Sequence, residues 1–350
     1  MGKQFNTEKH KILTSTKTKR LCYSKGYFWI EDSKQEKKSV LVSTQKITKY
    51  RLFERALRLV PRTGFTLYEE FYFSLRGFLY HVDEVKKEAE PVFQFRKGMN
   101  NPLMICKCQW AHKEIVYWGE YWPNPDRDQV SIFAFDGNKV KKVCILSGIK
   151  HIHSIVWDKY RCCFWITTGD TDDESRIYRA SRTFDNLEVV FMGKQKYRTC
   201  ALIPMEKGLL YATDSPLCSN SLLFSESEKD CFLEPVEVSP LPGPCIFCQE
   251  YHHKYYFSTS VEPNPNQNII SYWMSCKTSP GNVDRKSYVL CVDNNLKTQN
   301  VFMAKKDIHN MAFFQFGSIQ LLNDVYTDSL VGYCVALSKY DGKSVKLMQN

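Results

Sequence analysis

No long hydrophobic run interrupts this chain of 350 residues. A helix that spans a membrane needs about 20 mostly apolar residues, and no uncharged stretch approaches that length. The N-terminal segment, MGKQFNTEKHKILTSTKTKR, is polar and basic and contains no apolar core of a signal peptide. The sequence therefore predicts neither a membrane span nor a secretion signal, and it favours a cytoplasmic location.

The sequence motifs of several large enzyme classes are also missing. The chain has no P-loop, no glycine-rich dinucleotide fingerprint and no nucleophile elbow. These absences argue against nucleotide hydrolysis, Rossmann-type redox chemistry and α/β-hydrolase chemistry. Helical periodicity is confined to residues 48–60, so the sequence predicts very little helix.

The net charge of +10 comes from lysines and arginines that are scattered among acidic residues. They form no stripe along a helix, so the charge does not indicate nucleic-acid binding. The 14 cysteines lie mostly inside strand-like apolar runs. In a chain with no secretion signal this placement predicts reduced thiols that act as small buried hydrophobes.

A repeated pattern dominates the sequence: an aromatic or aliphatic segment runs into a short polar cluster. The clusters begin at Asp32, Asp83, Glu120, Thr168, Asp214, Ser260 and Asp324. From Glu120 to Ser260 they lie 46 to 48 residues apart, and a period of roughly 45 residues is typical of propeller blades. Fifteen residues before each of the last five clusters, another apolar run begins, at Ile105, His153, Thr199, Cys245 and His309.

These spacings predict an all-β fold, a single β-propeller of four-stranded antiparallel blades. Seven blades are expected, with six as the alternative. Residues 1–20 form a basic leader that is either flexible or contributes a closing strand, and residues 21–350 form the propeller domain. The first blade is the least regular, because its inner strand would have to lie in the polar segment ILTSTKTKR.

In an antiparallel blade, the start of the inner strand and the end of the second strand lie at the same mouth of the propeller. This order predicts a polar mouth built mainly by blades three to five. Three carboxylates there are candidate acid–base residues, since paired carboxylates can separate into a general acid and a base. They are Glu120, Asp170 and Asp214. Candidate substrate-binding residues around them are Tyr121, Trp122, Asn124, Arg127, Asp128, Arg198, Asp172 and Glu174.

Three histidines are expected at the same mouth: His151, His153 and His309. Together with Asp170 or Glu120 they could hold a divalent metal, since imidazole and carboxylate form a common first shell. Hydrogen-bonded histidines that line the channel without a metal are the alternative. No cofactor is required by the sequence.

Three segments together resemble one known family: GEYWPNPDRDQVSIFAFDG, HIHSIVWDKYRCCFWITTGDTDDESRIYRAS and LLYATDSPLCSN. They are similar to the sialidase-like, BNR-repeat β-propeller proteins of microbial glycan and polysaccharide gene clusters, over roughly residues 60–240. The Asp box of that family has only a trace here, Ser181 to Asp185, without its glycine or tryptophan, and Leu-Val-Pro-Arg62 is a weak echo of its N-terminal arginine motif. The resemblance implies a propeller with a carbohydrate ligand.

Two functions remain open from the sequence. In the first, the mouth binds or processes a carbohydrate or glycoconjugate, either as a binding site or with glycoside hydrolase or lyase-like activity, with or without a metal. In the second, the propeller is a non-catalytic scaffold that binds a protein partner. Polar clusters at one mouth favour the first, and a wide apolar surface patch would favour the second.

Overall fold

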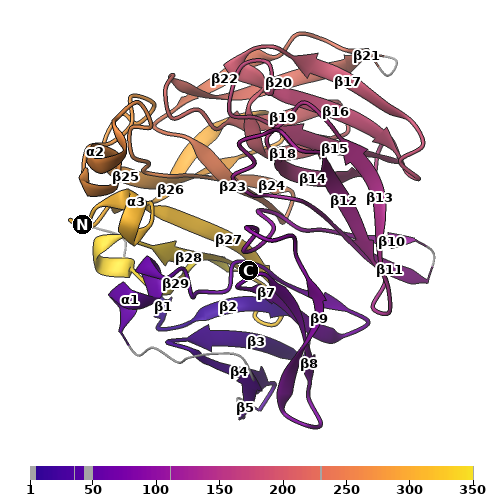
Figure 1. Cartoon of the computed structure of the whole chain (residues 1–350), viewed down its shortest axis with the longest axis vertical. Helices are drawn as coiled ribbons and strands as arrows, with labels where there is room; N and C mark the ends of the chain where they lie inside the picture. Colours follow the sequence, from indigo (N-terminus) through magenta and orange to yellow (C-terminus); the bar gives the residue numbers. More distant parts are fainter. Residues whose placement is uncertain (1–4, 35, 43–49, 111, 229–230, 350) are drawn as a thin grey trace.

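The structure is a computed structural model, and it describes residues 5–34, 36–42, 50–110, 112–228 and 231–349. The described residues form an all-β fold of six sheets. In Figure 1 the sheets follow one another around a ring, from indigo at the bottom through magenta at the right to yellow at the left. The arrangement is that of a β-propeller. Within the described ranges, no helix is long and apolar enough to cross a membrane.

Five of the six sheets are blades in which consecutive strands pair antiparallel. Their strands are β10 (Cys106–Trp110), β11 (Lys113–Gly119), β12 (Val130–Phe135) and β13 (Val140–Leu146); β14 (Ile152–Asp158), β15 (Cys163–Thr168), β16 (Arg176–Ser181) and β17 (Leu187–Met192); β18 (Thr199–Met205), β19 (Gly208–Thr213), β20 (Asn220–Glu228), β21 (Cys231–Phe232) and β22 (Val236–Leu241); β23 (Cys245–Tyr251), β24 (Lys254–Thr259), β25 (Lys286–Val292) and β26 (Thr298–Lys305); and β27 (Ser318–Asp324), β28 (Ser329–Val335) and β29 (Ser344–Gln349), which β1 (Thr7–Glu8) joins.

The sixth sheet has eight strands and consists of two antiparallel halves. Its strands are β2 (Lys11–Ser15), β3 (Lys19–Ser24), β4 (Tyr27–Asp32) and β5 (Lys37–Val42), then β6 (Gly64–Leu67), β7 (Glu70–Leu75), β8 (Phe78–Asp83) and β9 (Glu88–Gln94). The halves join through β5 and β9, which run parallel and pair over only two positions, Leu41 with Glu88 and Val42 with Ala89. The described helices are short: α1 (Arg51–Ala56), α2 (Ile269–Met274), α3 (Met311–Phe314) and the 3₁₀ turns η1 (Gln195–Tyr197) and η2 (Ser338–Tyr340).

The two ends of the described chain meet in one sheet, where β1 pairs antiparallel with β29. The next strand, β2, is buried along its whole length although its sequence is polar. The Lys11 ammonium explains how a polar inner strand is tolerated, because it donates to the carbonyl oxygens of Pro61 (2.7 Å) and Arg62 (2.9 Å) and to the side-chain oxygen of Gln320. A buried charge of this kind is stable only when its donors are satisfied.

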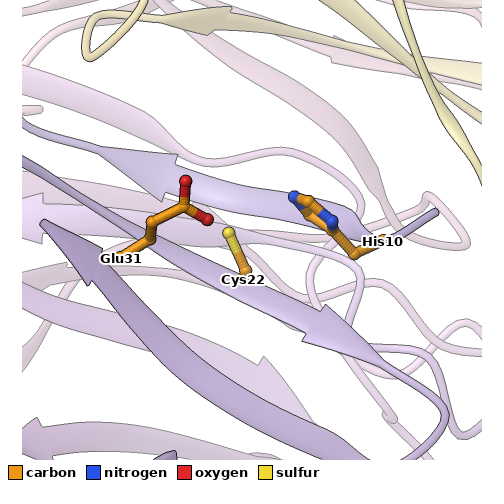
Figure 2. A group of neighbouring side chains, drawn as sticks. All are labelled: His10, Cys22 and Glu31. Carbon is orange, nitrogen blue, oxygen red and sulfur yellow. The ribbon is translucent and has the colours of Figure 1, made fainter. Parts of the chain in front are cut away.

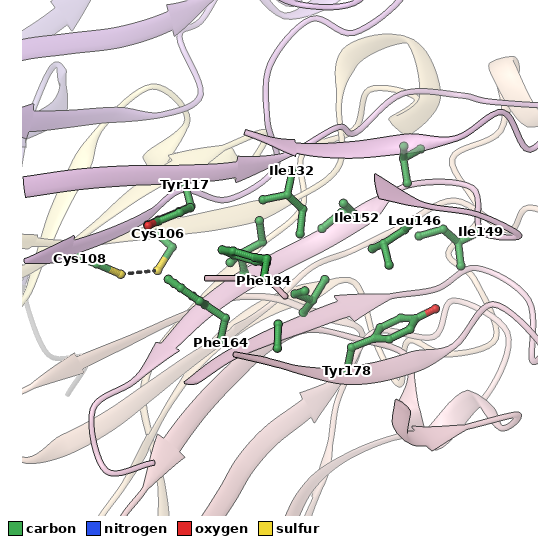
Figure 3. Close-up of a cluster of buried hydrophobic side chains, with 14 residues drawn as sticks. Cys106, Cys108, Tyr117, Ile132, Leu146, Ile149, Ile152, Phe164, Tyr178 and Phe184 are labelled. Atoms are coloured by element: carbon green, nitrogen blue, oxygen red, sulfur yellow. Dashed lines mark hydrogen bonds between the residues drawn. The ribbon is translucent and has the colours of Figure 1, made fainter. Parts of the chain in front are cut away.

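The hydrophobic core lies between neighbouring sheets. Figure 3 shows the cluster between blades β10–β13 and β14–β17, in which Tyr117, Ile132, Ile152 and Phe164 interdigitate. The Cys106 and Cys108 sulfur atoms pack 3.6 Å apart in this cluster. None of the chain's cysteines, all of which are described, forms a disulfide, and seven are buried.

Four of the inner strands share one irregularity. The register of β14 against β15 skips His153, and the register of β18 against β19 skips Cys200. Leu13 in β2 and Ile246 in β23 are skipped in the same way. Each is a β-bulge near the start of its strand, a device that re-aims a side chain and is common beside functional sites.

The polar clusters of the predicted repeat coincide with the ends of second strands only in the middle of the chain. Glu120, Thr168, Asp214 and Ser260 lie at the ends of second strands, as expected. Asp32 and Asp83 instead end the third strands β4 and β8, and Asp324 ends the inner strand β27. The slip arises because every strand of a blade is an alternating apolar run that ends in a polar turn, so the pattern does not distinguish one hairpin from the next.

Candidate functional site

His151 and His153 lie at the start of the inner strand β14, and both rings are buried. Their Nε2 atoms face each other at 3.2 Å. Each ring is held from behind by a backbone carbonyl: Nδ1 of His151 lies 3.0 Å from the oxygen of Trp122, and Nδ1 of His153 lies 3.2 Å from that of Thr199. The two rings therefore present their Nε2 atoms to one point.

Asp170 faces that point from the loop after β15. Its Oδ1 lies 3.6 Å from the Nε2 atoms of both histidines. Its backbone has a φ of 111°, a region that side-chain-bearing residues rarely adopt. The preceding Gly169 packs so closely that a Cβ there would lie 2.7 Å from the His153 ring. The close approach of the loop to the inner strand thus depends on glycine at this position.

Arg198 joins the group from the end of η1. Its Nη1 donates to the backbone oxygen of Asp170 at 2.9 Å, and its Nη2 lies 3.3 Å from the Asp170 carboxylate. On the other side, the Lys150 ammonium lies 2.6 Å from Oδ2 of Asp170. Asp170 is therefore held by two cations and two histidines.

Two more carboxyl groups, Asp214 and Glu262, are buried near Arg198. The Cys200 thiol donates to Oδ2 of Asp214 at 3.2 Å, while Oδ1 of Asp214 has no hydrogen-bond partner among the described residues. Glu262 accepts from the Ser260 hydroxyl at 2.6 Å. Arg198 is thus surrounded by one carboxyl group from each of three successive blades, β14–β17, β18–β22 and β23–β26.

The surroundings drive the pKa values of these carboxyls apart. Burial raises the pKa of Asp214 well above its usual value, and the nearby Glu262 raises it further. Burial also raises the pKa of Glu262. For Asp170 burial acts in the same direction but is outweighed by the two neighbouring histidines, which lower its pKa. Burial lowers the pKa of His153 to about 4, so this ring is neutral at pH 7.

A cavity of about 430 Å³ opens beside this cluster. Tyr121 and Trp122 form part of its wall, and the Tyr121 ring lies over His151 with 4.2 Å between ring centroids. The cavity is lined by Arg58, Val60, Arg62, Gly98, Asn100, Asn101, Leu103, Tyr121, Trp122, Pro123, Lys150, His151, Ile246, Phe247, Gln315, Phe316, Ser318, Gln320 and Val335. Its lining includes three cationic side chains and no carboxylate.

Arg58 and Arg62 have no carboxylate within ion-pair distance among the described residues. Arg58 donates from Nη2 to the oxygen of Ala312 at 3.1 Å. The Arg62 guanidinium lies over the Tyr121 ring at 5.9 Å. Burial and the neighbouring Arg62 lower the pKa of Arg58, which reflects two like charges held close together.

Glu120 is placed differently from Asp170 and Asp214. Its carboxylate is buried and accepts two hydrogen bonds from Arg96, at 2.8 and 3.1 Å, and one from the Ser131 amide at 2.8 Å. With these partners its oxygens are committed to holding the loop between β11 and β12. Both oxygens of this carboxylate are therefore engaged, and a catalytic role for Glu120 stays a prediction.

The loop predicted to bind substrate is largely held by its own side chains. The Asn124 amide donates to the oxygens of Asp128 (2.9 Å) and Lys150 (2.8 Å), and its Oδ1 accepts from the Asp128 amide. Arg127 forms an ion pair with Glu174 in the next blade. Asp172 is exposed. Of this predicted set, Tyr121 and Trp122 line the cavity, and Arg198 contacts Asp170.

His309 does not join His151 and His153. It precedes α3, half-buried, with its ring 5.3 Å from that of Phe314. The prediction assigned it to an inner-strand start by counting back from Asp324, but Asp324 ends the inner strand itself, which begins at Ser318. Counting back fifteen residues from Asp324 therefore passes the start of β27 and reaches the segment before it.

The sequence reasoning missed several residues of the cluster and the cavity: Arg58, Arg62, Lys150, Cys200 and Glu262. Glu262 follows Ser260 by two residues, as Asp170 follows Thr168, so the repeat itself could have indicated it. The sequence points to Arg62 only through the weak similarity of Leu-Val-Pro-Arg62 to the N-terminal arginine motif of the sialidase-like family. Nothing in the sequence shows that the segment after α1 reaches the centre of the propeller.

A second group of potential metal ligands, His10, Cys22 and Glu31, lies where the first and last sheets meet (Figure 2). Arg20 already engages this region, with Nη2 3.1 Å from Glu31 and 2.7 Å from Glu8. Burial raises the pKa of Cys22, which keeps its thiol protonated. The arrangement is therefore an ion-pair network.

No family model matches the chain, and no curated protein matches its sequence. Among solved structures, it resembles the extracellular domain of a B. thetaiotaomicron protein assigned to the hybrid two component systems (TM-score 0.55, 8% identity), over 99% of this chain and 38% of that one. It also resembles a chain of the mitotic checkpoint complex (TM-score 0.53, 5% identity, 95% and 86% covered) and an oligogalacturonate lyase from Vibrio parahaemolyticus (TM-score 0.49, 10% identity, 98% and 91% covered). At these identities the likeness concerns the fold, a β-propeller, and no family model supports the sialidase-like assignment.

Proposed function

We propose that the cavity binds an acidic carbohydrate, a sugar that carries carboxylate, sulfate or phosphate groups. The observation that supports this most is the pair Arg58 and Arg62, which line the cavity without a carboxylate partner among the described residues. A guanidinium recognises planar oxyanions through two parallel hydrogen bonds. An anionic group between the two arginines would also relieve their mutual repulsion.

The rest of the lining suits a sugar ring. Tyr121, Trp122, Phe247 and Phe316 supply aromatic surface, and aromatic faces pack against the apolar face of a pyranose. Asn100, Asn101 and Gln315 supply amide groups that can pair with hydroxyls. A volume of about 430 Å³ lies within the range of small-molecule sites.

We further propose that the ligand is processed as well as bound, with Asp170 and Asp214 as the acid–base pair. Their pKa values are displaced in opposite directions, Asp170 downward and Asp214 upward. Carboxyls separated in this way can act as base and general acid at the same pH. Glu120 is left out of this pair because Arg96 and Ser131 engage its carboxylate.

The architecture we propose for this site is a seven-bladed, sialidase-like propeller. The two halves of the eight-stranded sheet are counted as separate blades, because β5 and β9 pair at only two positions. Each half has its own inner strand, β2 or β6, and a Cβ at Gly64 in β6 would lie 2.8 Å from the Leu13 oxygen in β2. The free thiols suit the cytoplasm, and we propose that location.

Calorimetry with acidic oligosaccharides and their neutral counterparts tests the binding. Wild-type protein should bind the acidic members, and Arg62→Gln should weaken that binding by about tenfold or more, the value of one charge-assisted hydrogen bond. Arg182→Gln is the matched control, because Arg182 is exposed and stacks on Trp110 at 4.0 Å, outside the cavity lining. Equal binding of neutral and acidic sugars, or an equal loss in both variants, would refute the proposal.

One surface feature favours the scaffold function instead. Ile269, Ile270, Trp273 and Met274 of α2 and Phe313 of α3 expose 43 to 74% of their surface. Trp273, Met274 and Phe313 line an apolar hollow there. In Figure 1 these helices gather with α1 at the left of the ring. Should no acidic sugar bind, and should the chain self-associate in a way that Trp273→Ser abolishes, the scaffold function would take precedence.

A further inference from the structure

We propose that His151, His153 and Asp170 bind one divalent transition-metal ion at the edge of the cavity. The inference does not depend on sugar binding in the cavity, because it stands on the geometry of three side chains. With an ion bound, Asp170 is a metal ligand and not the free base of the acid–base pair proposed above. Two of them come from the start of one inner strand and the third from the loop after the adjacent strand.

The three ligand atoms form a triangle of suitable size. Its sides are 3.2 Å between the two Nε2 atoms and 3.6 Å from each of them to Oδ1 of Asp170. The point equidistant from all three lies about 2.0 Å from each, and zinc binds imidazole nitrogen and carboxylate oxygen at about 2.0 to 2.2 Å. An ion therefore fits without movement of the ligands.

The hydrogen bonds behind the rings make an empty triangle unfavourable. A carbonyl oxygen only accepts, so the bonds to Trp122 and Thr199 place the hydrogen of each imidazole on Nδ1. In neutral rings both Nε2 atoms then carry lone pairs, which repel each other at 3.2 Å. A cation between them removes the repulsion, and a backbone carbonyl on the outer nitrogen is the usual support of a metal-bound histidine.

The surrounding charges permit an ion here. Lys150 engages Oδ2 of Asp170 and leaves Oδ1 directed at the histidines, while Arg198 approaches Oδ1 to 3.3 Å. The carboxyls of Asp214 and Glu262 also lie near Arg198. Oδ1 of Asp214 is buried without a partner among the described residues, and a carboxylate oxygen of Asp214 lies within 4.8 Å of a His153 ring nitrogen.

The ligand set selects the class of metal. Calcium and magnesium prefer all-oxygen sites, whereas two imidazoles and one carboxylate suit zinc, manganese, iron(II) or cobalt. Three protein ligands leave coordination positions open, as in catalytic rather than structural sites. His151 lines the cavity, so a ligand there would reach the ion.

Metal binding to the chelator-stripped full-length protein tests the site without any sugar. Zinc and manganese titrations, followed by calorimetry and elemental analysis, should show one ion per chain, and cobalt(II) should give ligand-field absorption bands. His153→Ala and Asp170→Asn should each weaken binding by at least about tenfold. His309→Ala is the matched control and should bind like wild type.

The alternative occupant of the triangle is a proton shared by the two rings. Nitrogen NMR of the stripped protein would then show an imidazolium hydrogen on one Nε2, and neither zinc nor manganese would bind more tightly than to Asp170→Asn. That result overturns the proposal. If His153→Ala fails to fold, the proposal is tested by metal binding to Asp170→Asn and by the cobalt(II) absorption spectrum of the wild type. Acidic sugar binding to stripped protein reports separately on the carbohydrate proposal.

Discussion

The Arg96 guanidinium meets the Glu120 carboxylate edge to edge, with Nε 2.8 Å from Oε1 and Nη2 3.1 Å from Oε2. Because the pair also fixes the Ser131 amide, it ties the loop after β11 to the start of β12. Glu120→Gln removes one charge from this arrangement and leaves Arg96 with a weaker partner. We expect a loss of about 1 to 3 kcal/mol in the free energy of unfolding, with metal and sugar binding unchanged.

Urea denaturation of wild type and Glu120→Gln checks this expectation, alongside the calorimetric titrations. A variant as stable as wild type that no longer binds ligand would return Glu120 to the catalytic residues, where the sequence analysis placed it.

Asp170 and Asp214 should affect stability with opposite dependence on pH. The pKa of Asp214 is raised in the folded protein, so the folded state retains a proton that the unfolded chain releases, and stability falls as pH rises from about 4 toward the folded-state value. Asp214→Asn should therefore stabilise the protein at neutral pH. Asp170 has a lowered pKa, so its contribution is present above pH 4 and is lost on acidification.

Denaturation curves collected between about pH 2.5 and 8 in the presence of a chelator measure both slopes, because the Asp170 contribution changes below pH 4 and the Asp214 contribution above it. The free energy of unfolding of the wild type, relative to that of Asp214→Asn, should decrease as the pH rises. A flat difference would mean that Asp214 is ionised in the folded protein and cannot serve as the proposed acid.

Gly169→Ala should damage the proposed metal site without replacing any of its ligands. Its Cβ would lie 2.7 Å from Cε1 of His153 and 2.9 Å from Cγ of Arg198, so one of these side chains must move. Overpacking of this kind costs about 1 to 3 kcal/mol. Metal affinity and thermal stability should both fall, and His153→Ala in the same chain should recover part of the stability. Absence of that recovery would show that the collision is not with the ring.

Arg20 should be essential to the closure of the ring. It is buried and lies within ion-pair distance of Glu8 in β1, Glu31 in β4 and Asp324 in β27. Arg20→Ala would leave buried carboxylates without their cation, at a cost of about 3 to 5 kcal/mol. Lys86→Ala provides the control, since Lys86 forms ion pairs only at the exposed surface and should not alter the melting temperature measurably. Equal melting temperatures for the two variants would contradict a role in closure.

The thiols should react slowly until the protein unfolds. Seven cysteines are buried and three are exposed. Titration with a thiol reagent should therefore count few groups in the native protein and all 14 in denaturant. A denatured count well below 14 without reductant would reveal disulfides.

The middle of the propeller could be predicted from the sequence because its strands obey one period. Glu120, Thr168, Asp214 and Ser260 mark equivalent turns, and the antiparallel order correctly brought His151, His153, Asp170 and Arg198 together. Prediction failed where a local pattern has two solutions. Asp324 ends the strand β27, and Asp214 directly follows the strand β19. The two sequence patterns look alike, but β27 is the first strand of its blade and β19 is the second.

The cavity could not be predicted, because two of its three cationic side chains come from outside the repeat. Arg58 and Arg62 follow α1, in the link between the two halves of the eight-stranded sheet, and only the tertiary fold brings that link to the centre. Likewise, the burial of Lys11 depends on the carbonyls of Pro61 and Arg62, about 50 residues away. Neither of these contacts can be inferred from the composition or the spacing of the sequence.

An inner strand both packs the blade and presents side chains near the axis. The bulges at Leu13, His153, Cys200 and Ile246 allow different residues to do the two tasks. A bulged residue stands outside the cross-strand ladder, so its side chain can change without disturbing the alternation that packs the blade. The four positions hold leucine, histidine, cysteine and isoleucine in otherwise similar strands. His153, Cys200 and Ile246 lie outside the hydrophobic core clusters, whereas Leu13 packs in one. New ligand chemistry could therefore be introduced near the axis by Cys200→His or Ile246→His while the blades keep their cores.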